Sequence, residues 1–137
     1  MSMESVDIYM ESYNTLNTIQ KCIDTVETIG IPYNLMDSKS ASWLRDRIRN
    51  YLSTITDMYQ KRRGERDFVK DDYMEFIDHM ERQNTMDKII IDFTKMQPKH
   101  ACELRALIKE TVNVRKINVW KVIQGGYTPI DRNGCMC

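Results

Sequence analysis

The sequence has no long apolar run, no net charge and few cysteines, and each of these features excludes a class of protein. No stretch approaches the ~20 apolar residues that a membrane-spanning helix needs. The N-terminal segment Met1-Ser2-Met3-Glu4 lacks the basic and apolar regions of a signal peptide. The 20 basic and 20 acidic residues cancel, so no overall field draws the chain to nucleic acid or to an anionic membrane. We therefore expect an intracellular, cytoplasmic protein.

The four cysteines do not form a disulfide framework. Cys22 and Cys102 fall within predicted helices, whereas Cys135 and Cys137 lie at the end of the chain. The ending Cys135-Met136-Cys137 resembles the doubly prenylated terminus of Rab-type small GTPases, but the phosphate-binding loop of that family is missing. We interpret the two terminal thiols as free side chains on a tail and not as a lipid anchor.

Glycine and proline are also scarce, and most of them stand where a helical pattern ends. Apolar side chains recur every three or four residues from about Ser5 to Ile29, which predicts a long first helix. Gly30 can cap this helix in a left-handed conformation, and Pro32 prevents its continuation.

A second helix is predicted from Asp37 or Ser38, either of which can accept the free amide protons of a first turn. It ends with Lys61-Arg62-Arg63 before Gly64, where cations favour the negative end of the helix dipole. A third helix, from Phe68 and Val69 to Met80, follows.

A short fourth helix is predicted from about Asn84 to Met96, although Ile89-Ile90-Ile91 alone also fits a strand. Pro98 either ends this helix or stands in the first turn of a fifth helix that carries Leu104 and Ile108. Residues 114–123 fit both a strand and a helix, and we favour a helix.

The pattern predicts an all-α protein. We recognise no internal repeat, low-complexity tract or linker, so residues 1–124 should form one compact, irregular bundle of five or six helices. Residues 125–137 contain glycine and proline but little apolar surface, which predicts a flexible C-terminal tail.

Ionisable clusters offer little catalytic chemistry. Asp71, Glu75 and Asp78 share one helix face, an arrangement similar to the magnesium-binding carboxylates of small all-helical nucleotide pyrophosphohydrolases. A second helix with matching carboxylates is missing, and His79 and His100 stand beside no recognisable nucleophile. We therefore predict no catalytic residue, metal or cofactor, and keep a magnesium-dependent enzyme as the third hypothesis.

Basic residues concentrate around the second helix and suggest a second hypothesis. Guanidinium groups can pair with phosphates while nearby aromatic rings stack on bases, which is how single-stranded nucleic acid is held without sequence readout. The candidate residues for binding RNA are Arg45, Arg49, Lys61, Arg62, Arg63 and Arg66.

The ten methionines are many for this length, and flexible thioethers adapt to irregular partner surfaces. A long apolar first helix also favours a symmetric homodimer. The candidate residues for a partner groove or dimer face are Tyr9, Tyr13, Leu16, Met36, Met74 and Met86.

Our first hypothesis is a non-enzymatic helical module that binds another protein. Alanine is nearly absent, with only Ala41, Ala101 and Ala106, while isoleucine and methionine are plentiful. Because an A/T-rich coding sequence produces this bias, we interpret the chain as a small viral regulatory or accessory protein that acts on a host protein.

Overall fold

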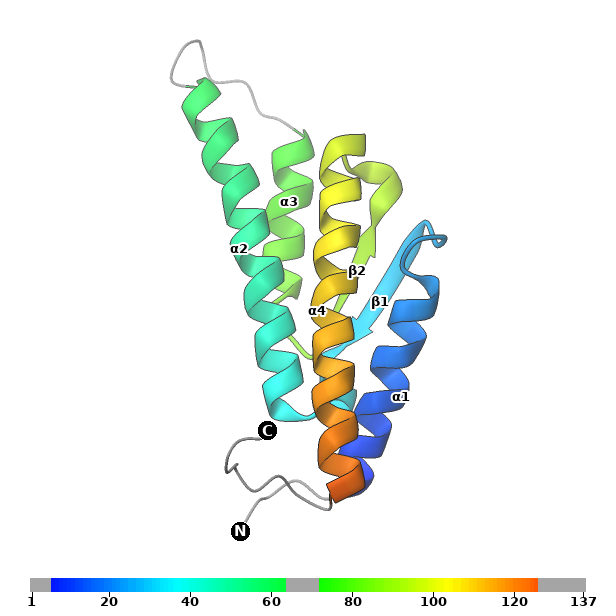
Figure 1. The fold of residues 1–137 in the computed structure, drawn as a ribbon. Coiled ribbons are helices and arrows are strands. Elements are labelled where there is room, and N and C mark those ends of the chain that lie inside the picture. Colours follow the sequence, from blue (N-terminus) through cyan, green and yellow to red (C-terminus); the bar gives the residue numbers. More distant parts are fainter. Residues whose placement is uncertain (1–5, 64–71, 126–137) are drawn as a thin grey trace.

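Helices make up most of the protein, and a small sheet joins them (Figure 1). The computed structural model describes residues 6–63 and 72–125. This part of the chain contains four helices and one two-stranded antiparallel sheet. The helices are α1 (Val6–Cys22), α2 (Ser38–Arg63), α3 (Asp72–Gln83) and α4 (Pro98–Gly125); the strands are β1 (Thr28–Pro32) and β2 (Lys88–Asp92), and the 3-10 turns are η1 (Tyr33–Leu35) and η2 (Phe93–Lys95). The helical class is confirmed, but the exclusion of strands was wrong.

The predicted first helix is wrong beyond Cys22, because the chain turns there and enters β1. Ile29 and Ile31 are buried while Gly30 between them is exposed, which is the alternation of a strand. Gly30 therefore lies in the middle of a strand, opposite Ile90, and does not cap a helix.

The predicted fourth helix is also wrong. Lys88–Asp92 forms β2, with Ile89 and Ile91 fully buried and Ile90 exposed. Each strand supplies two isoleucines to the core, and the pairing of β1 with β2 satisfies backbone groups that neither segment satisfies alone.

Two helix starts agree with the sequence. Asp37 is the N-cap of α2, since its Oδ2 accepts a hydrogen bond of 3.1 Å from the amide of Ser40. Pro98 opens α4, and residues 114–123 continue this same helix instead of forming a separate one. The predicted start of the third helix at Phe68 and Val69, and the predicted tail after Gly125, lie outside the described residues.

The order of elements repeats, which corrects the expectation that the chain has no internal repeat. Each half consists of a helix, a strand, a 3-10 turn and a long helix. The second half follows the first at an offset of 60 residues from the strand onward. Nine residues recur unchanged from the strand to the end of the long helix: Ile29, Ile31, Met36, Lys39, Ala41, Leu44, Arg45, Ile48 and Lys61 correspond to Ile89, Ile91, Met96, Lys99, Ala101, Leu104, Arg105, Ile108 and Lys121.

The two halves are related by an approximate twofold axis. In the antiparallel pairing, Gly30 lies opposite Ile90, its own equivalent in the second half, and the register extends evenly to both sides. Burial follows the same rule, because Leu44, Ile48 and their equivalents Leu104 and Ile108 are all fully buried. The core is formed by the inner sides of all four helices together with the sheet, and α4 lies between α2 and α1 (Figure 1).

Two equivalent arginines tie the halves together. Nη1 of Arg105 donates hydrogen bonds of 2.6 and 2.8 Å to the carbonyl oxygens of Ile23 and Val26, just beyond the end of α1. Its guanidinium lies 4.0 Å from the centre of the Phe93 ring. The hydrogen bonds hold the segment between α1 and β1 against α4, and the ring contact holds η2, which follows β2.

The equivalent contact in the first half belongs to Arg45. Its Nη2 donates a hydrogen bond of 2.9 Å to the carbonyl oxygen of Met86, and its guanidinium lies 4.4 Å from the centre of the Tyr33 ring. Burial raises the pKa of Tyr33, and the positive charge of Arg45 opposes this only in part. The protonated hydroxyl donates to the side-chain oxygen of Asn84.

The strand position of Gly30 gives a first testable prediction. A Cβ atom at this position would meet Lys88 Cδ at 4.0 Å, an ordinary contact. Because β-branched residues favour strands and glycine weakens them, Gly30→Val should raise the free energy of unfolding by about 0.5–1 kcal/mol. Urea denaturation followed by circular dichroism measures this change. A loss of about 1 kcal/mol would indicate instead a glycine-requiring backbone and contradict the strand geometry.

Candidate functional site

The approximate twofold symmetry provides an internal control for finding a functional surface. Among the described residues, four exposed apolar side chains lie on and beside α4: Trp43, Val114, Ile117 and Trp120 are 42%, 37%, 49% and 45% exposed. Their equivalents in the other half are Glu103, Thr54, Asp57 and Gln60, all of them polar. The fold therefore accepts polar residues at these positions, and the apolar character of the four residues on this one of the two equivalent surfaces needs another reason. We call these four residues the α4 face.

The α4 face crosses the outer side of α4 from α2 to α1. Val114, Ile117 and Trp120 follow one another at three-residue spacing, which places them side by side on the helix surface. At one end, the Trp43 ring lies 5.6 Å from the guanidinium carbon of Arg115. At the other end, the Trp120 ring lies 5.3 Å from the ring of Tyr13 on α1.

A buried ion pair fixes the α2 end of this face. Arg115 Nη2 lies 3.5 Å from Asp37 Oδ2, and only 1% of Asp37 is exposed. Ser12 donates a 2.7 Å hydrogen bond to Asp37 Oδ1, while Arg115 Nε donates a 2.9 Å hydrogen bond to Ser40 Oγ. Because both charges are hydrogen bonded and nearly dry, the guanidinium is held in one orientation.

The equivalent end of the other half is built differently. Gln97 stands where the first half has Asp37, His100 replaces Ser40, and the fully buried Ile55 replaces Arg115. The Tyr73 hydroxyl lies 2.7 Å from His100 Nδ1 and accepts a hydrogen bond of 3.3 Å from the amide of Gln97. A hydrogen-bonded network of Tyr73, His100 and Gln97 thus stands where the other end has the Asp37–Arg115 ion pair.

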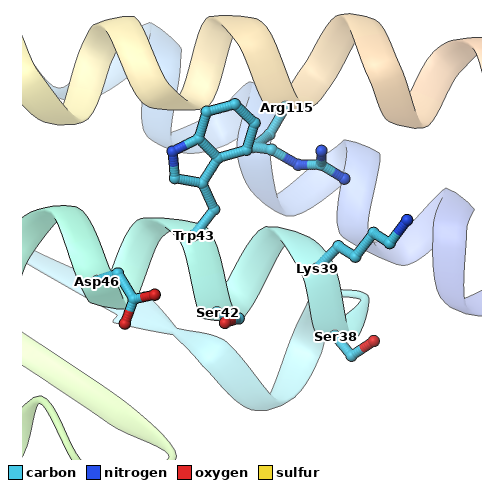
Figure 2. Close-up of a pocket in the computed structure, with 6 residues that line it drawn as sticks. All are labelled: Ser38, Lys39, Ser42, Trp43, Asp46 and Arg115. Carbon is cyan, nitrogen blue, oxygen red and sulfur yellow. The ribbon is translucent and has the colours of Figure 1, made fainter.

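A pocket of about 610 Å³ opens beside Trp43 and Arg115. Figure 2 shows the side chains of Lys39 and Arg115 extending to the same side of the Trp43 ring. The pocket is lined by Ser38, Lys39, Ser42, Trp43, Asp46 and Arg115.

Charges along the α4 face are unevenly balanced. Asp46 pairs with Arg49 at 2.9 Å, and Glu110 pairs with Arg47 at 3.4 Å. Lys39 lies one helical turn before Trp43, and Lys121 lies one turn beyond Ile117, both of them exposed. Neither lysine is in an ion pair with another described residue.

These two lysines lie at the same end of the face, because α2 and α4 run in opposite directions (Figure 1). On α2 and α4, that end therefore carries two cations that no carboxylate of these helices pairs.

The structure does not bring the six predicted groove residues to one surface. Leu16, Met36 and Met74 are buried in the core. Tyr9 and Tyr13 are half-buried on α1, and Met86 is 60% exposed in the turn before β2. Moreover α1 is 17 residues long, so the length that favoured a homodimer through this helix is not present.

The described part of the basic cluster is engaged within the protein. Arg45 caps the turn at Met86, and Arg49 pairs with Asp46. Lys61, Arg62 and Arg63 form the end of α2, but the description does not extend to their side chains, and Arg66 lies outside the described residues.

The acidic cluster of the enzyme hypothesis lies on α3, where Asp72, Glu75 and Asp78 are exposed; Asp71 is outside the described residues. In residues 6–63 and 72–125, no three histidine, cysteine or acidic side chains come together in a way that could hold a metal ion. Cys22 and Cys102 are free thiols, whereas Cys135 and Cys137 are not described.

Sequence reasoning missed the α4 face, and the signal that could have found it is the 60-residue repeat. Trp43 and Trp120 fit an apolar helical stripe when each helix is taken alone. Aligned with Glu103 and Gln60, they stand out as differences between two otherwise similar halves.

No protein-family model, curated protein or solved structure matches this chain.

Proposed function

We propose that this protein is a non-enzymatic interaction module and that a protein partner binds on the α4 face. The observation that carries the proposal is the difference between the halves: four exposed apolar side chains stand where the equivalent residues are polar. Exposed apolar groups that the fold does not need are typical of binding surfaces.

Trp43 and Trp120 supply the aromatic anchors that dominate most protein interfaces. The ridge of Val114 and Ile117 between them runs along a helix, beside a second, antiparallel helix. Such a surface suits an amphipathic partner helix, whose apolar side chains reach it at three- and four-residue spacing.

The other hypotheses from the sequence remain predictions. One of them is a symmetric homodimer through the first helix. RNA binding would depend on Arg45, Arg49, Lys61, Arg62, Arg63 and Arg66, which are not among the four residues of the α4 face. A viral role and a cytoplasmic location rest on composition alone.

The proposal is tested with short helical peptides selected from a displayed library against the whole protein. Fluorescence anisotropy of a selected peptide measures its affinity for the wild type and for variants that introduce the residues of the other half. Trp43→Glu and Ile117→Asp should each weaken binding about tenfold or more, because an anchor is lost and a charge is placed in the contact. The matched controls Glu103→Gln and Asp57→Asn, at the equivalent positions, should leave the affinity unchanged.

Three outcomes would overturn the proposal. Selection of no peptide, or equal binding by all four variants, would exclude the α4 face as a peptide-binding surface. A wild-type dimer that Ile117→Asp converts to a monomer in light scattering would make the occupant a second copy of the chain. Binding of labelled single-stranded RNA at low salt, lost at higher salt, would favour nucleic acid instead.

A further inference from the structure

We infer that the pocket beside Trp43 is a carboxylate subsite, which receives an aspartate or glutamate side chain of an amphipathic helix in the protein partner. This inference rests on the proposed function, because it states the chemistry of the partner that the α4 face binds. The apolar side of that helix contacts the α4 face, and its acidic end lies at Lys39 and Lys121.

The geometry of the pocket fits this role. Arg115 lines the pocket and is only 9% exposed as a residue, and its guanidinium is oriented by Asp37 and Ser40. Lys39 extends beside it from the other helix (Figure 2). A carboxylate that enters the pocket meets the fixed guanidinium of Arg115 and the flexible ammonium of Lys39. The Trp43 ring shields the carboxylate from bulk water, which strengthens its charge-assisted hydrogen bonds.

The charges on α2 and α4 also fit an acidic partner. Asp37 is neutralised by Arg115, and the outer carboxylates Asp46 and Glu110 are paired with arginines. On α2 and α4, the charges at this end that no described residue pairs are the cations of Lys39 and Lys121, while the exposed carboxylates Asp7 and Glu11 lie beside them on α1. A partner whose acidic residues lie here gains attraction without displacing an existing ion pair.

The second half again serves as a control. Lys99 is the equivalent of Lys39 and is likewise exposed, but beside it Glu103 replaces Trp43 and the buried Ile55 replaces Arg115. A lysine alone therefore recurs in both halves, whereas the combination of lysine, arginine and tryptophan occurs at the pocket only.

The test is a charge swap between the whole protein and a synthetic helical peptide that carries leucines at helical spacing and glutamates at one end. Lys39→Glu should weaken binding of this peptide about tenfold, and replacing the peptide's glutamates with lysines should restore the affinity to Lys39→Glu while weakening binding to the wild type. Lys99→Glu is the matched control and should not alter either affinity. Because Lys39 is exposed, its substitution should leave the urea midpoint unchanged.

The outcomes separate this inference from the proposed function. If Ile117→Asp abolishes binding but Lys39→Glu binds both peptides as the wild type does, the α4 face is a binding surface and the carboxylate subsite is wrong. If the lysine peptide binds the wild type better than the glutamate peptide, the partner is basic and the inference is also wrong. If neither peptide responds to Ile117→Asp, the proposed function itself fails.

Discussion

Asp37→Ala is expected to lower the free energy of unfolding by about 3–5 kcal/mol, because it leaves the guanidinium of Arg115 buried without a counter-charge. Asp37 is 1% exposed and holds three groups at once: the hydroxyl of Ser12, the amide of Ser40 and the guanidinium of Arg115. The substitution also removes the N-cap of α2, which contributes about 1 kcal/mol to such a loss. Since domains of this size have stabilities of about 5–15 kcal/mol, the change is large. Urea denaturation measures it.

A second variant keeps this prediction testable if Asp37→Ala fails to fold. The pair Asp37→Asn with Arg115→Met removes both charges, retains an acceptor for the Ser40 amide, and should be more stable than Asp37→Asn alone. The matched control is Gln97→Ala, at the equivalent position of the other half, which should cost less than about 1 kcal/mol. Equal losses for Asp37→Ala and Gln97→Ala would mean that the ion pair contributes nothing beyond helix capping.

Helix starts could be predicted from the sequence because their signals are local. Asp37 and Ser38 at the start of α2, and Pro98 in the first turn of α4, specify an end by side-chain chemistry within a few residues. The strands could not be predicted from local signals of this kind. Ile29 and Ile31 alternate over only five residues, and their burial depends on Ile89 and Ile91, 60 residues away in the chain.

The misplaced helix end at Gly30 shows why the same residue supports two interpretations. Glycine followed by Ile31 and Pro32 is a typical helix stop, but it also fits an exposed strand position opposite Ile90. Only the pairing with β2 decides between them, and this pairing is a long-range contact. The repeat of Ile29-x-Ile31 as Ile89-x-Ile91 carries the missing information, since two equivalent strands can pair about a twofold axis.

The site was harder to predict than the fold, because burial decides which apolar residues are available. Leu16, Met36 and Met74 were expected at a partner surface and lie in the core, where their volume fills the space between helices. Trp43 fits the apolar helical stripe of α2 by its spacing, yet it is 42% exposed. A single helix cannot separate these cases by periodicity, whereas comparison with the equivalent polar residues of the second half can.

Arg105→Met is expected to lower the free energy of unfolding by about 2–3 kcal/mol, because two backbone carbonyls beyond α1 lose a charged donor. The hydrogen bonds to Ile23 and Val26 are 2.6 and 2.8 Å long, and the stack on Phe93 is lost as well. Methionine preserves most of the apolar volume, so the lost free energy of unfolding measures the contribution of the hydrogen-bond donors and the positive charge of Arg105. Urea denaturation measures the total change in the free energy of unfolding. Backbone amide hydrogen exchange should become faster at residues 23–28 before it does so elsewhere.

The equivalent variant Arg45→Met provides the comparison that separates capping from stacking. Both guanidinium groups lie over an aromatic ring, at 4.0 Å from Phe93 and 4.4 Å from Tyr33, but Arg45 donates to the single carbonyl of Met86. If carbonyl capping holds the halves together, Arg105→Met should cost more than Arg45→Met, and Arg105→Lys should recover part of the loss. Equal costs would assign the stabilisation to the ring contacts, which the two halves share. In either case the effect should exceed that of Arg49→Met, whose ion pair with Asp46 is exposed to solvent.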